Sequence, residues 1–600
     1  MAFQYQTYPF KKPPELCGSK PKIYDVVIVG AGLAGLTMAL ALAKQGVKCV
    51  LLDDSNQVSV GSRAICFSKQ SLEIFDKLCV AKPMIEKGVQ WNVGRIFFRE
   101  KEIDRFDLSP EKLSKYPAFI NLQQYYVEHF LIDAVLKEEN IDVRWLNKVV
   151  NVKQLSKSFK LLESLVEVEI ETPEGNYSLK SKYVVACDGS RSPIRNLLNL
   201  EMHGERFEEH FLIADFRMSK GNPTEEADFP SERWFWFDPP FARGQSILLH
   251  KQPDNLWRLD FKLGKHVDSS IANNHDFIKE KIRSVVGERP FELDWTSIYS
   301  FSSKMLDRFV HGNIVFVGDS AHVVSPFGAR GANSGIADAN NLSWKLAEIL
   351  RGGTISDLGF QISETDGKTQ NILRGGNTAL LETYNAERTA AAIQNIACTG
   401  ETNTFIAPPS EAATTLRNEI LIKARTDSIY KKQINCGRLS VPNVYGKYPN
   451  SEEGTWKNAD LEAGKAIKDC DLDDNMEHPD KIGKTYLIEK LKYQFTLLIL
   501  RDRLNEKDRD LLKKNNIKVL AINYRKNTAL MTLYELGIDT AYLITPDQYI
   551  LGRWKDFDIN KAIDLKKIYL SGAVYDNTTL QKTEQERIDE EVAKQLRSLS

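Results

Sequence analysis

A long apolar stretch follows Asp25 near the start of the chain. Residues 26–43 read VVIVGAGLAGLTMALALA and carry no charge, and a run of about 18 such residues is long enough to be a candidate membrane span. Its internal pattern indicates something else. Four β-branched residues precede a glycine-rich turn and a segment of leucine, methionine and alanine, which predicts a buried strand at 26–29 and a helix at 33–44. A second apolar run at 47–52 predicts another strand, which ends at Asp53.

The turn between the first strand and the helix contains Gly30, Gly32 and Gly35 in the spacing GxGxxG. A diphosphate reaches the backbone N–H groups of a helix N-terminus only where no side chain blocks it, and the helix dipole favours its charge. Asp53 lies 18 residues after the last glycine, where an acid accepts hydrogen bonds from a ribose diol. The pattern therefore predicts a dinucleotide site, for FAD or NAD(P), in place of a membrane span.

The middle of the chain, about 203–299, has the alternation of a β-sheet. Two strands are predicted around the turn Gln-Pro-Asp-Asn in SILLHKQPDNLWRLDFKL. In WRLDF, Trp257, Leu259 and Phe261 share one face, and Arg258 and Asp260 share the other. That polar face either covers an active site, with Arg258 and Trp236 as candidates for substrate contact, or faces solvent. The sequence leaves both alternatives open.

Composition narrows the function classes. The chain has 600 residues, enough for several domains, and 80 Lys+Arg against 81 Asp+Glu give no electrostatic reason to expect nucleic acid or an acidic membrane as partner. The eight cysteines form no CxxC and the histidines no HExxH, which argues against a metal site or a disulfide scaffold and favours a reducing, cytoplasmic location. Residues 1–22 lack the apolar core of a secretion signal and are interpreted as an arm.

Two further motifs follow predicted strands. DGSRSPIR (188–195) offers Ser192 as a helix N-cap and Pro193 as the first helical residue. GDSAHVVSPFGARGAN (318–333) leads into a segment with helical spacing of apolar residues. Together with GxGxxG, these motifs resemble the FAD-dependent aromatic-ring hydroxylases, the single-component flavin monooxygenases that act on phenol, hydroxybenzoate and hydroxyphenylpropionate. The resemblance covers about residues 22–400.

The resemblance implies an α/β fold of several parts. They are an N-terminal arm (1–22), a discontinuous Rossmann-type FAD-binding domain (23–202 and 300–400), an inserted mixed β-sheet substrate domain (203–299), a helical connection and linker (401–465) and a thioredoxin-like domain (466–600). No cysteine follows Cys470, so disulfide exchange is excluded from that last part, and a structural or oligomerising role, such as a homodimer contact, is expected there. Residues 360–377 are interpreted as a surface insertion.

The resemblance also implies roles for individual residues. They are Gly30, Gly32 and Gly35 for the diphosphate, Asp53 for the adenosine ribose, Arg63 and Gln124 (or Gln123 as the alternative) for the flavin, Asp188 for FAD and the nicotinamide cofactor, Asp319 for the ribityl chain, Pro326 for the flavin–substrate junction, and Gly331, Ala332 and Asn333 for the pyrimidine side of the flavin. Ala329 and Arg330 depart from the residues that many members carry. His322 is interpreted as structural, because no partner acid is evident in its motif. The sequence identifies no catalytic base.

There is one dinucleotide motif, so the nicotinamide cofactor is expected to bind transiently. The implied activity is an FAD-dependent monooxygenase that uses NADH or NADPH and O2 to hydroxylate a phenolic or other aromatic compound through a flavin C4a-hydroperoxide. Two alternatives stay open: a flavin oxidase or a monooxygenase acting on a non-aromatic acceptor, and a low-turnover flavoprotein that serves as a scaffold. No nucleic acid, membrane span or metal is expected.

Overall fold

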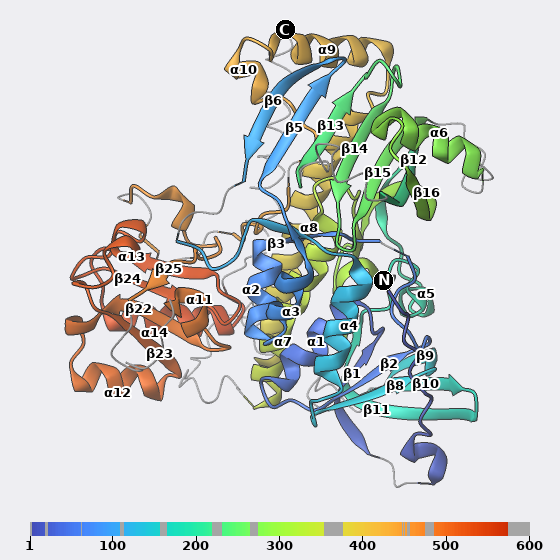
Figure 1. Ribbon diagram of the computed structural model, residues 1–600. Coiled ribbons are helices and arrows are strands. Elements are labelled where there is room, and N and C mark those ends of the chain that lie inside the picture. Colours follow the sequence, from blue (N-terminus) through green and yellow to red (C-terminus); the bar gives the residue numbers. More distant parts are fainter. Residues whose placement is uncertain are drawn as a thin grey trace. The chain divides into compact units, whose positions relative to one another are not determined.

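The computed structural model describes residues 3–18, 22–61, 63–108, 113–155, 165–218, 231–264, 274–352, 376–437, 439–446, 448, 451–452, 456–473 and 485–573. The chain divides into two compact units (Figure 1). Unit 1 comprises Met1–Leu155, Leu165–Ser343 and Ala392–Val441, and unit 2 comprises Ser156–Ser164, Trp344–Ala391 and Pro442–Ser600. The predicted insertion at 360–377 falls outside the described residues except for its last two. The predicted domain boundaries stay a prediction.

The first sheet of unit 1 is built on the predicted strand, helix and strand. They are β1 (Ile23–Val29), α1 (Leu33–Ala43) and β2 (Cys49–Asp53), so the apolar run is divided between two elements. The other strands of this sheet are β8 (Ile141–Trp145), β9 (Lys148–Leu155), β10 (Leu165–Thr172), β11 (Gly175–Ala186), β17 (Val310–His311) and β18 (Ile314–Phe316). The order is β17-β18-β11-β1-β2-β8, and the five strands from β18 to β8 pair in parallel. The carboxyl ends of these strands therefore meet at one edge, where ligands bind in such sheets.

The second sheet of unit 1 has the order β19-β16-β12-β15-β14-β13-β5-β6. Its strands are β5 (Val93–Phe98), β6 (Lys101–Asp107), β12 (His203–Met218), β13 (Arg233–Phe237), β14 (Ser246–Lys251), β15 (Leu256–Gly264), β16 (Phe291–Met305) and β19 (His322–Val323). Helix α6 (His275–Val286) packs with Trp257, Leu259 and Phe261 in one apolar cluster (Figure 1). This confirms the predicted faces of WRLDF and leaves the polar face of the sheet turned the other way.

Smaller elements complete unit 1. They are η1 (Pro14–Cys17), α2 (Lys69–Lys77), α3 (Ala81–Lys87), α4 (Gln124–Val135), α5 (Pro193–Leu197), η4 (Gly318–Ser320), α9 (Glu411–Lys423), α10 (Ser428–Lys431) and a sheet of β3 (Cys66–Ser68), β4 (Val89–Gln90) and β7 (Phe119–Asn121). Helices α7 (Arg330–Leu350) and α8 (Gly376–Ile406) have residues in both units. The predicted cap is confirmed, because the Ser192 side chain accepts a hydrogen bond from the Arg195 N–H at 3.0 Å. The arm is ordered where it is described, and Tyr8 stacks on Trp145 with 4.9 Å between ring centroids.

Unit 2 contains a strand, a helix, a second strand and a hairpin in chain order. A four-stranded sheet has the order β23-β22-β24-β25, with β22 and β23 parallel and the other pairs antiparallel. The elements of this part of unit 2 are η7 (Ala459–Leu461), β20 (Asp471–Leu472), β21 (Thr485–Tyr486), α11 (Leu487–Lys490), β22 (Phe495–Leu500), η8 (Arg501–Arg503), α12 (Glu506–Lys514), β23 (Ile517–Ile522), α13 (Thr528–Leu533), β24 (Ala541–Ile544), β25 (Ile550–Trp554) and α14 (Ile559–Leu570). The thioredoxin-like assignment stays a prediction.

The described residues from 442 to 465, at the end of the predicted connection and linker, belong to unit 2. The Gly464 N–H donates to the Ile550 carbonyl, and the Tyr445 N–H donates to the Gly464 carbonyl, each at 2.8 Å. The backbone of this segment is thus held by hydrogen bonds to Ile550 and within the segment itself.

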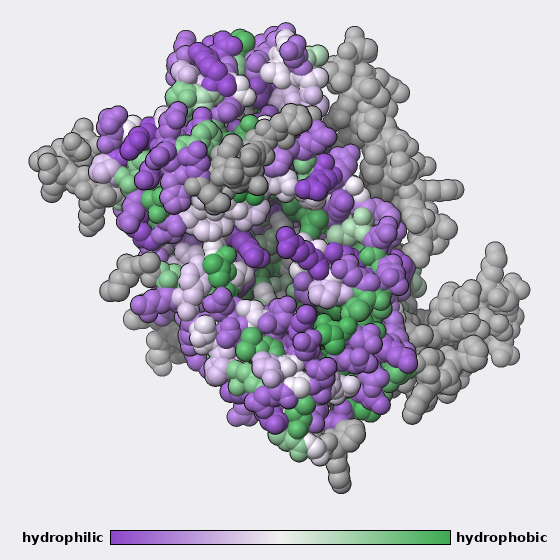
Figure 2. All heavy atoms as spheres, turned by 90° about the vertical axis from the view of Figure 1, so that its right-hand side faces the viewer, coloured by the Kyte–Doolittle hydropathy of each residue, from purple (hydrophilic) through white to green (hydrophobic). Residues whose placement is uncertain are grey.

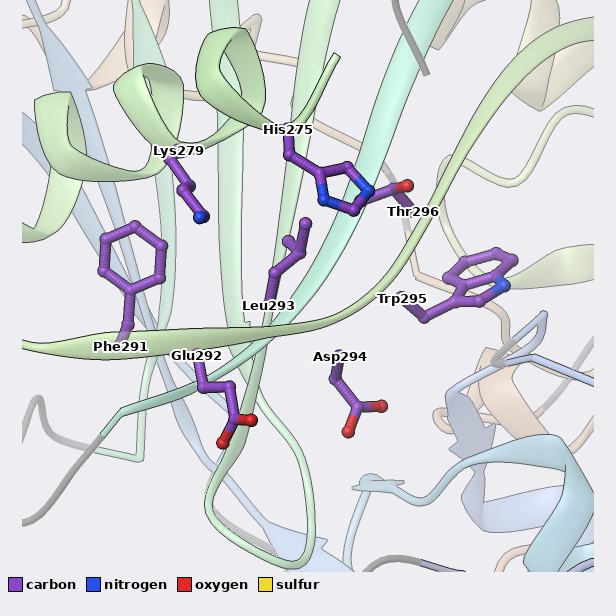
Figure 3. Close-up of a pocket in the computed structure, with 8 residues that line it drawn as sticks. All are labelled: His275, Lys279, Phe291, Glu292, Leu293, Asp294, Trp295 and Thr296. Atoms are coloured by element: carbon purple, nitrogen blue, oxygen red, sulfur yellow. The ribbon is translucent and has the colours of Figure 1, made fainter. Parts of the chain in front are cut away.

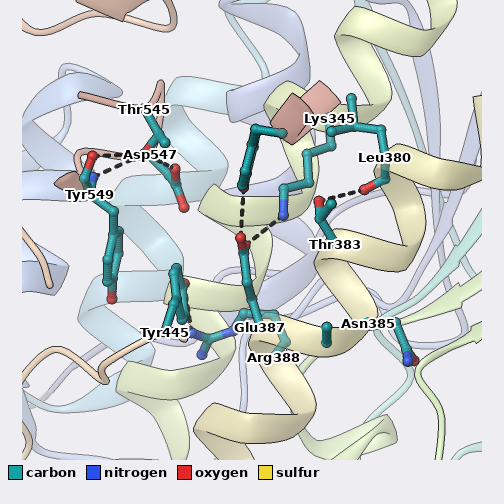
Figure 4. A network of polar contacts seen from close by, with 12 residues as sticks. Lys345, Leu380, Thr383, Asn385, Glu387, Arg388, Tyr445, Thr545, Asp547 and Tyr549 are labelled. Atoms are coloured by element: carbon teal, nitrogen blue, oxygen red, sulfur yellow. Dashed lines mark hydrogen bonds and ion pairs between the residues drawn. The ribbon is translucent and has the colours of Figure 1, made fainter. Parts of the chain in front are cut away.

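A buried polar network lies at the centre of unit 2 (Figure 4). The Lys345 ammonium donates to Glu387 at 2.6 Å, and the Tyr569 hydroxyl donates to the other oxygen of the same carboxylate at 2.7 Å. Both charged side chains are fully buried, and burial lowers the pKa of Lys345 while Glu387 opposes that shift. The desolvated ion pair thus joins α7 to α8, and the Tyr569 hydroxyl ties helix α14 to the same carboxylate.

Among the helices that the structure describes, none has both the length and the hydropathy needed to cross a bilayer. The described atoms on the face shown in Figure 2 are mostly hydrophilic, with small hydrophobic clusters between them.

Candidate functional site

Unit 1 contains a cavity of about 800 Å³ that is lined by the second sheet and by segments that follow strands of the first sheet. The glycine turn, the segment 59–66 and the start of α7 form one wall, and the polar face of the second sheet forms the other. This volume lies within the 300–1,000 Å³ that is typical of small-molecule and cofactor sites. The edge where the parallel strands end is therefore open to a ligand.

The three positions of the turn are occupied by glycine for different physical reasons. A side chain at Gly30 would place its Cβ 2.3 Å from the Cys187 carbonyl oxygen, and one at Gly35 would place it 1.8 Å from the Gly30 carbonyl oxygen. Both glycines are thus required by the packing of the protein itself. A Cβ at Gly32 would approach only a Glu128 oxygen, at 4.0 Å, and Gly32 lines the cavity. The room beside Gly32 is left for a ligand.

The N-terminus of α1 has N–H groups to offer that ligand. Its N-cap is Gly32, which has no side chain to accept a hydrogen bond from the first turn. The first N–H groups of a helix have no partner within the helix, and together with the helix dipole they form an anion site. The turn, the helix start and the cavity therefore fit a diphosphate.

Asp53 lies at the end of β2, as predicted, and its carboxylate braces the turn. It accepts hydrogen bonds from the Ala31 N–H and from the Ser55 N–H, the latter at 2.8 Å. Burial raises the pKa of Asp53 to about 6, against the effect of these two hydrogen bonds. Asp53 is not among the residues that line the cavity, and the remaining lone pairs of its oxygens would accept from a ribose diol at the edge of the site.

The segment 59–64 carries Arg63 to the cavity and is held by helix α4. Gln124 accepts from the Ala64 N–H at 3.1 Å and donates to Glu128 at 2.8 Å. Glu128 in turn accepts from the Ser59 N–H at 2.7 Å. Arg63, Gln124 and Glu128 line the cavity, whereas Gln123 is fully buried and its amide donates to the Pro253 carbonyl at 3.4 Å.

Glu128 was missed from the sequence, although its spacing gives a signal. It lies four residues after Gln124, so both side chains are on one face of α4. Burial raises the pKa of Glu128, while its hydrogen bonds and the charge of Arg63 oppose that shift. Its role is to position the segment that carries Arg63.

Asp188 and Asp319 bring two further carboxylates to the cavity. One Asp188 oxygen accepts from the Ile194 N–H at 3.0 Å, and the other is buried without a partner. Burial raises the pKa of both acids. Asp319 lines the cavity and is exposed to it, although protein atoms surround its carboxylate closely. The charges of His322 and Arg63 oppose the rise of the Asp319 pKa. Both acids can accept hydrogen bonds from ligand hydroxyl groups.

Helix α7 begins at Arg330, so Gly331 and Ala332 lie at a helix start on the cavity wall, close to Pro326. Asn333 is different, because its side chain is buried and bound within the protein. Its carbonyl oxygen accepts from the Ser68 N–H at 2.9 Å, and its amide donates to the Cys66 carbonyl at 3.0 Å. Asn333 thus fixes strand β3 against α7, and only its backbone remains available to a cofactor.

The opposite wall combines aromatic and charged side chains. Phe211, Phe301 and Phe327 pack on one another, with ring centroids 5.0 to 5.6 Å apart, and all three line the cavity. Arg233, His250, Arg258 and Asp260 lie on the same wall. An apolar surface with a few convergent polar groups is typical of a site for a small organic ligand.

Two candidates for substrate contact have different surroundings. Arg258 lines the cavity, but its guanidinium donates twice to Asp215, at 2.8 and 3.0 Å. Trp236 does not reach the cavity, because it packs with Phe97 in the cluster on the far side of the sheet. Successive residues of a strand point to opposite faces, and Arg233, three residues before Trp236 in β13, is the one that lines the cavity.

His322 is buried, and it has an acidic partner that the sequence did not reveal. Its Nε2 lies 2.8 Å from Asp338, which also accepts from the Gly318 N–H at 3.0 Å. The expectation that no acid accompanies His322 was wrong, because the acid comes from α7. The structural interpretation of His322 agrees with this arrangement, which joins the strand end to the helix.

A second recess, of about 480 Å³, lies along α6 and β16 (Figure 3). Lys279 and His275 extend from α6 toward the strand, and Glu292 and Asp294 leave the strand on the side opposite Leu293. It has no glycine turn, and the N-terminus of α6 at its edge is already capped by the Asn274 side chain, which accepts from the Phe277 N–H at 3.1 Å, so the larger cavity is the candidate site.

The comparisons with known proteins agree with this geometry. A family model described as an FAD binding domain matches residues 23–358, more than half of the chain. A 3-(3-hydroxy-phenyl)propionate/3-hydroxycinnamic acid hydroxylase of Mycolicibacterium smegmatis is 25% identical over 406 residues, which are 67% of this chain and 65% of that protein. A probable NADH-specific resorcinol 4-hydroxylase of Rhodococcus jostii is 27% identical over 345 residues, 57% of this chain and 62% of that protein. The chain thus spans less than two thirds of the length of these relatives.

Solved structures share the fold over nearly the whole chain. The flavin-dependent monooxygenase PieE, in complex with FAD and substrate, superposes with a TM-score of 0.71 at 19% identity and covers 92% of this chain and 100% of its own. Aklavinone-11 hydroxylase, with FAD and aklavinone, gives 0.69 at 18% identity, with 93% and 99% covered. At these identities the likeness concerns the fold.

Proposed function

Because this chain belongs to the family defined by that FAD binding domain, we propose that it is an FAD-dependent monooxygenase. It uses NADH or NADPH and O2 to hydroxylate a phenolic or other aromatic compound. The names of the relatives support the aromatic class. One observation carries the proposal: a single cavity has a dinucleotide wall on one side and an aromatic wall with convergent polar groups on the other. Bound FAD, reduced by the nicotinamide cofactor, supplies the oxygen activation.

The residues of this chain hold and orient the two ligands. The N–H groups at the start of α1 bind the diphosphate beside Gly32. Gln124 and Glu128 fix the segment that carries Arg63. The helix start at Gly331 stabilises negative charge near it by about 0.3–2 kcal/mol. The packed phenylalanines exclude water from the aromatic end of the cavity, which strengthens every electrostatic interaction there.

Steady-state oxidation of NADH and NADPH by the FAD-loaded protein tests this function. We expect slow oxidation without substrate and much faster oxidation with a phenol, accompanied by an oxygenated product. Stoichiometric peroxide without product would support a flavin oxidase, oxygenation of non-aromatic acceptors alone would support the second monooxygenase class, and no turnover would support a scaffold. A cytoplasmic location, where both nicotinamide cofactors occur, and a homodimer held by unit 2 are parts of the proposal. Cell fractionation and light scattering test them.

A further inference from the structure

A row of polar side chains crosses the cavity face of the second sheet. Arg258 on β15 lies directly opposite His250 on β14 and Asp215 on β12. The pairing of Trp234 with Leu249 continues by one residue to place Arg233 beside His250. All four side chains are at least nine-tenths buried. The row therefore sets two buried guanidinium groups, one carboxylate and one imidazole against the aromatic end of the site.

The charges in this row are not equally satisfied. Arg258 is neutralised by Asp215 through two hydrogen bonds, and it donates a third to the Arg63 carbonyl at 2.9 Å. A guanidinium with these partners has little left to offer a ligand. Arg258 is thus better described as a part of the wall than as an anchor.

His250 adds no positive charge at neutral pH. Its pKa is lowered to about 4, chiefly by burial and also by the charges of Arg233 and Arg258, while the contact with Asp260 at 3.5 Å opposes the shift. The neutral ring therefore leaves Arg233 as the cation beside it.

Arg233 is the exception in the row. Only 6% of its surface is exposed, and it lines the cavity. Within the part of the chain that the structure describes, no carboxylate forms an ion pair with its guanidinium. The centre of the Trp91 ring lies 6.0 Å from the guanidinium carbon, and Gly437 is close to one of its nitrogens. A buried charge is strongly disfavoured unless it is paired. The cavity beside Arg233 thus has the chemistry of an anion site.

Resting on the proposed function, we propose that Arg233 binds an oxyanion of the aromatic substrate and so selects for acidic aromatic compounds. The oxyanion is either a carboxylate attached to the ring or the ionised phenolic oxygen. In both cases a charge-assisted hydrogen bond, bidentate for a carboxylate, fixes the ring against the phenylalanine wall. Arg258, although adjacent, supports this site without binding the anion.

The test compares Arg233→Met and Arg233→Lys with Arg243→Met, a control at an arginine whose side chain is 56% exposed. Each FAD-loaded variant is assayed for product formation with 3-(3-hydroxyphenyl)propionate and with its uncharged amide. Binding of benzoate and benzamide is measured by calorimetry, which needs no turnover. FAD content and thermal unfolding verify that each variant is folded.

If the oxyanion is a carboxylate, Arg233→Met lowers kcat/KM for the acid by about 10- to 100-fold and leaves the amide within about threefold, and benzoate binding weakens equally. If it is the phenolate, acid and amide lose equally, and activity returns as the pH approaches the pKa of the phenol. Arg233→Lys retains part of the preference. If a folded Arg233→Met protein keeps its activity with both substrates and still binds benzoate as the wild type does, the anion site is refuted. A wild-type protein that binds benzoate through Arg233 but hydroxylates no phenol contradicts the proposed function alone.

Discussion

Replacing Gly32 by alanine separates binding of the cofactor from folding. The new Cβ would meet only a Glu128 oxygen at 4.0 Å, and the backbone at Gly32, with φ −80° and ψ −171°, suits any residue. We therefore expect the free energy of unfolding of the FAD-free protein to change by no more than about 0.5 kcal/mol. The same methyl group occupies the room left for the diphosphate. Loss of one charge-assisted hydrogen bond, about 1.5–3 kcal/mol, raises the Kd for FAD by about 10- to 140-fold.

The assay is titration of the FAD-free protein with FAD, followed by flavin fluorescence, beside chemical denaturation without FAD. Gly35→Ala is the matched control, because its Cβ would lie 1.8 Å from the Gly30 carbonyl oxygen and the fold itself should be destabilised. A Gly32→Ala protein that binds FAD as tightly as the wild type would refute the assignment of the turn to the diphosphate. Equal destabilisation by both substitutions would refute the distinction between the two glycines.

Three further outcomes are expected. The affinity for FAD should rise as the pH rises through about 6, because only the ionised form of Asp53 accepts well from a ribose diol. Asp53→Asn should flatten this dependence, and a pH-independent Kd in the wild type would contradict the role of Asp53. Tyr5→Phe should speed FAD release by about 2- to 10-fold in stopped-flow measurements, since the Tyr5 hydroxyl accepts from the Gly61 N–H at 3.1 Å and so holds the segment that carries Arg63. An unchanged release rate would show that the N-terminal arm does not help to retain FAD. Lys345→Met should lower the free energy of unfolding of unit 2 by about 3–5 kcal/mol, because Glu387 loses its buried cation. The double variant Lys345→Met, Glu387→Leu should recover most of the lost free energy, and additive losses in it would argue against a coupled pair.

Local sequence patterns predicted the elements of the fold well. The strand, helix and strand around GxGxxG, the cap at Ser192 and the pair of strands around Gln-Pro-Asp-Asn all depend on neighbours within a few residues. The alternation in WRLDF even gave the correct faces, because the period of a strand is two residues. These features need no knowledge of which segments pair.

Features that depend on distant pairing were not predictable in the same way. His322 lies beside Asp338 only because α7 returns to the strand end, and Arg233 lies beside His250 only through the register of two strands. Trp236 was selected on the wrong face, because the face of an isolated strand is fixed only after the sheet is formed and a shift of one residue inverts every assignment. Pairing of Arg258 with Asp215 likewise appears only in three dimensions.

Isotope labelling of the oxygenated product tests the central claim most directly. The FAD-loaded protein is supplied with NADH or NADPH and a phenolic acid under oxygen-18 gas, and the product is analysed by mass spectrometry. The account predicts that each hydroxylated product molecule carries one oxygen-18 atom and that one nicotinamide cofactor is oxidised per product. Cofactor oxidation that yields only peroxide, or a product whose new oxygen comes from water, would contradict it.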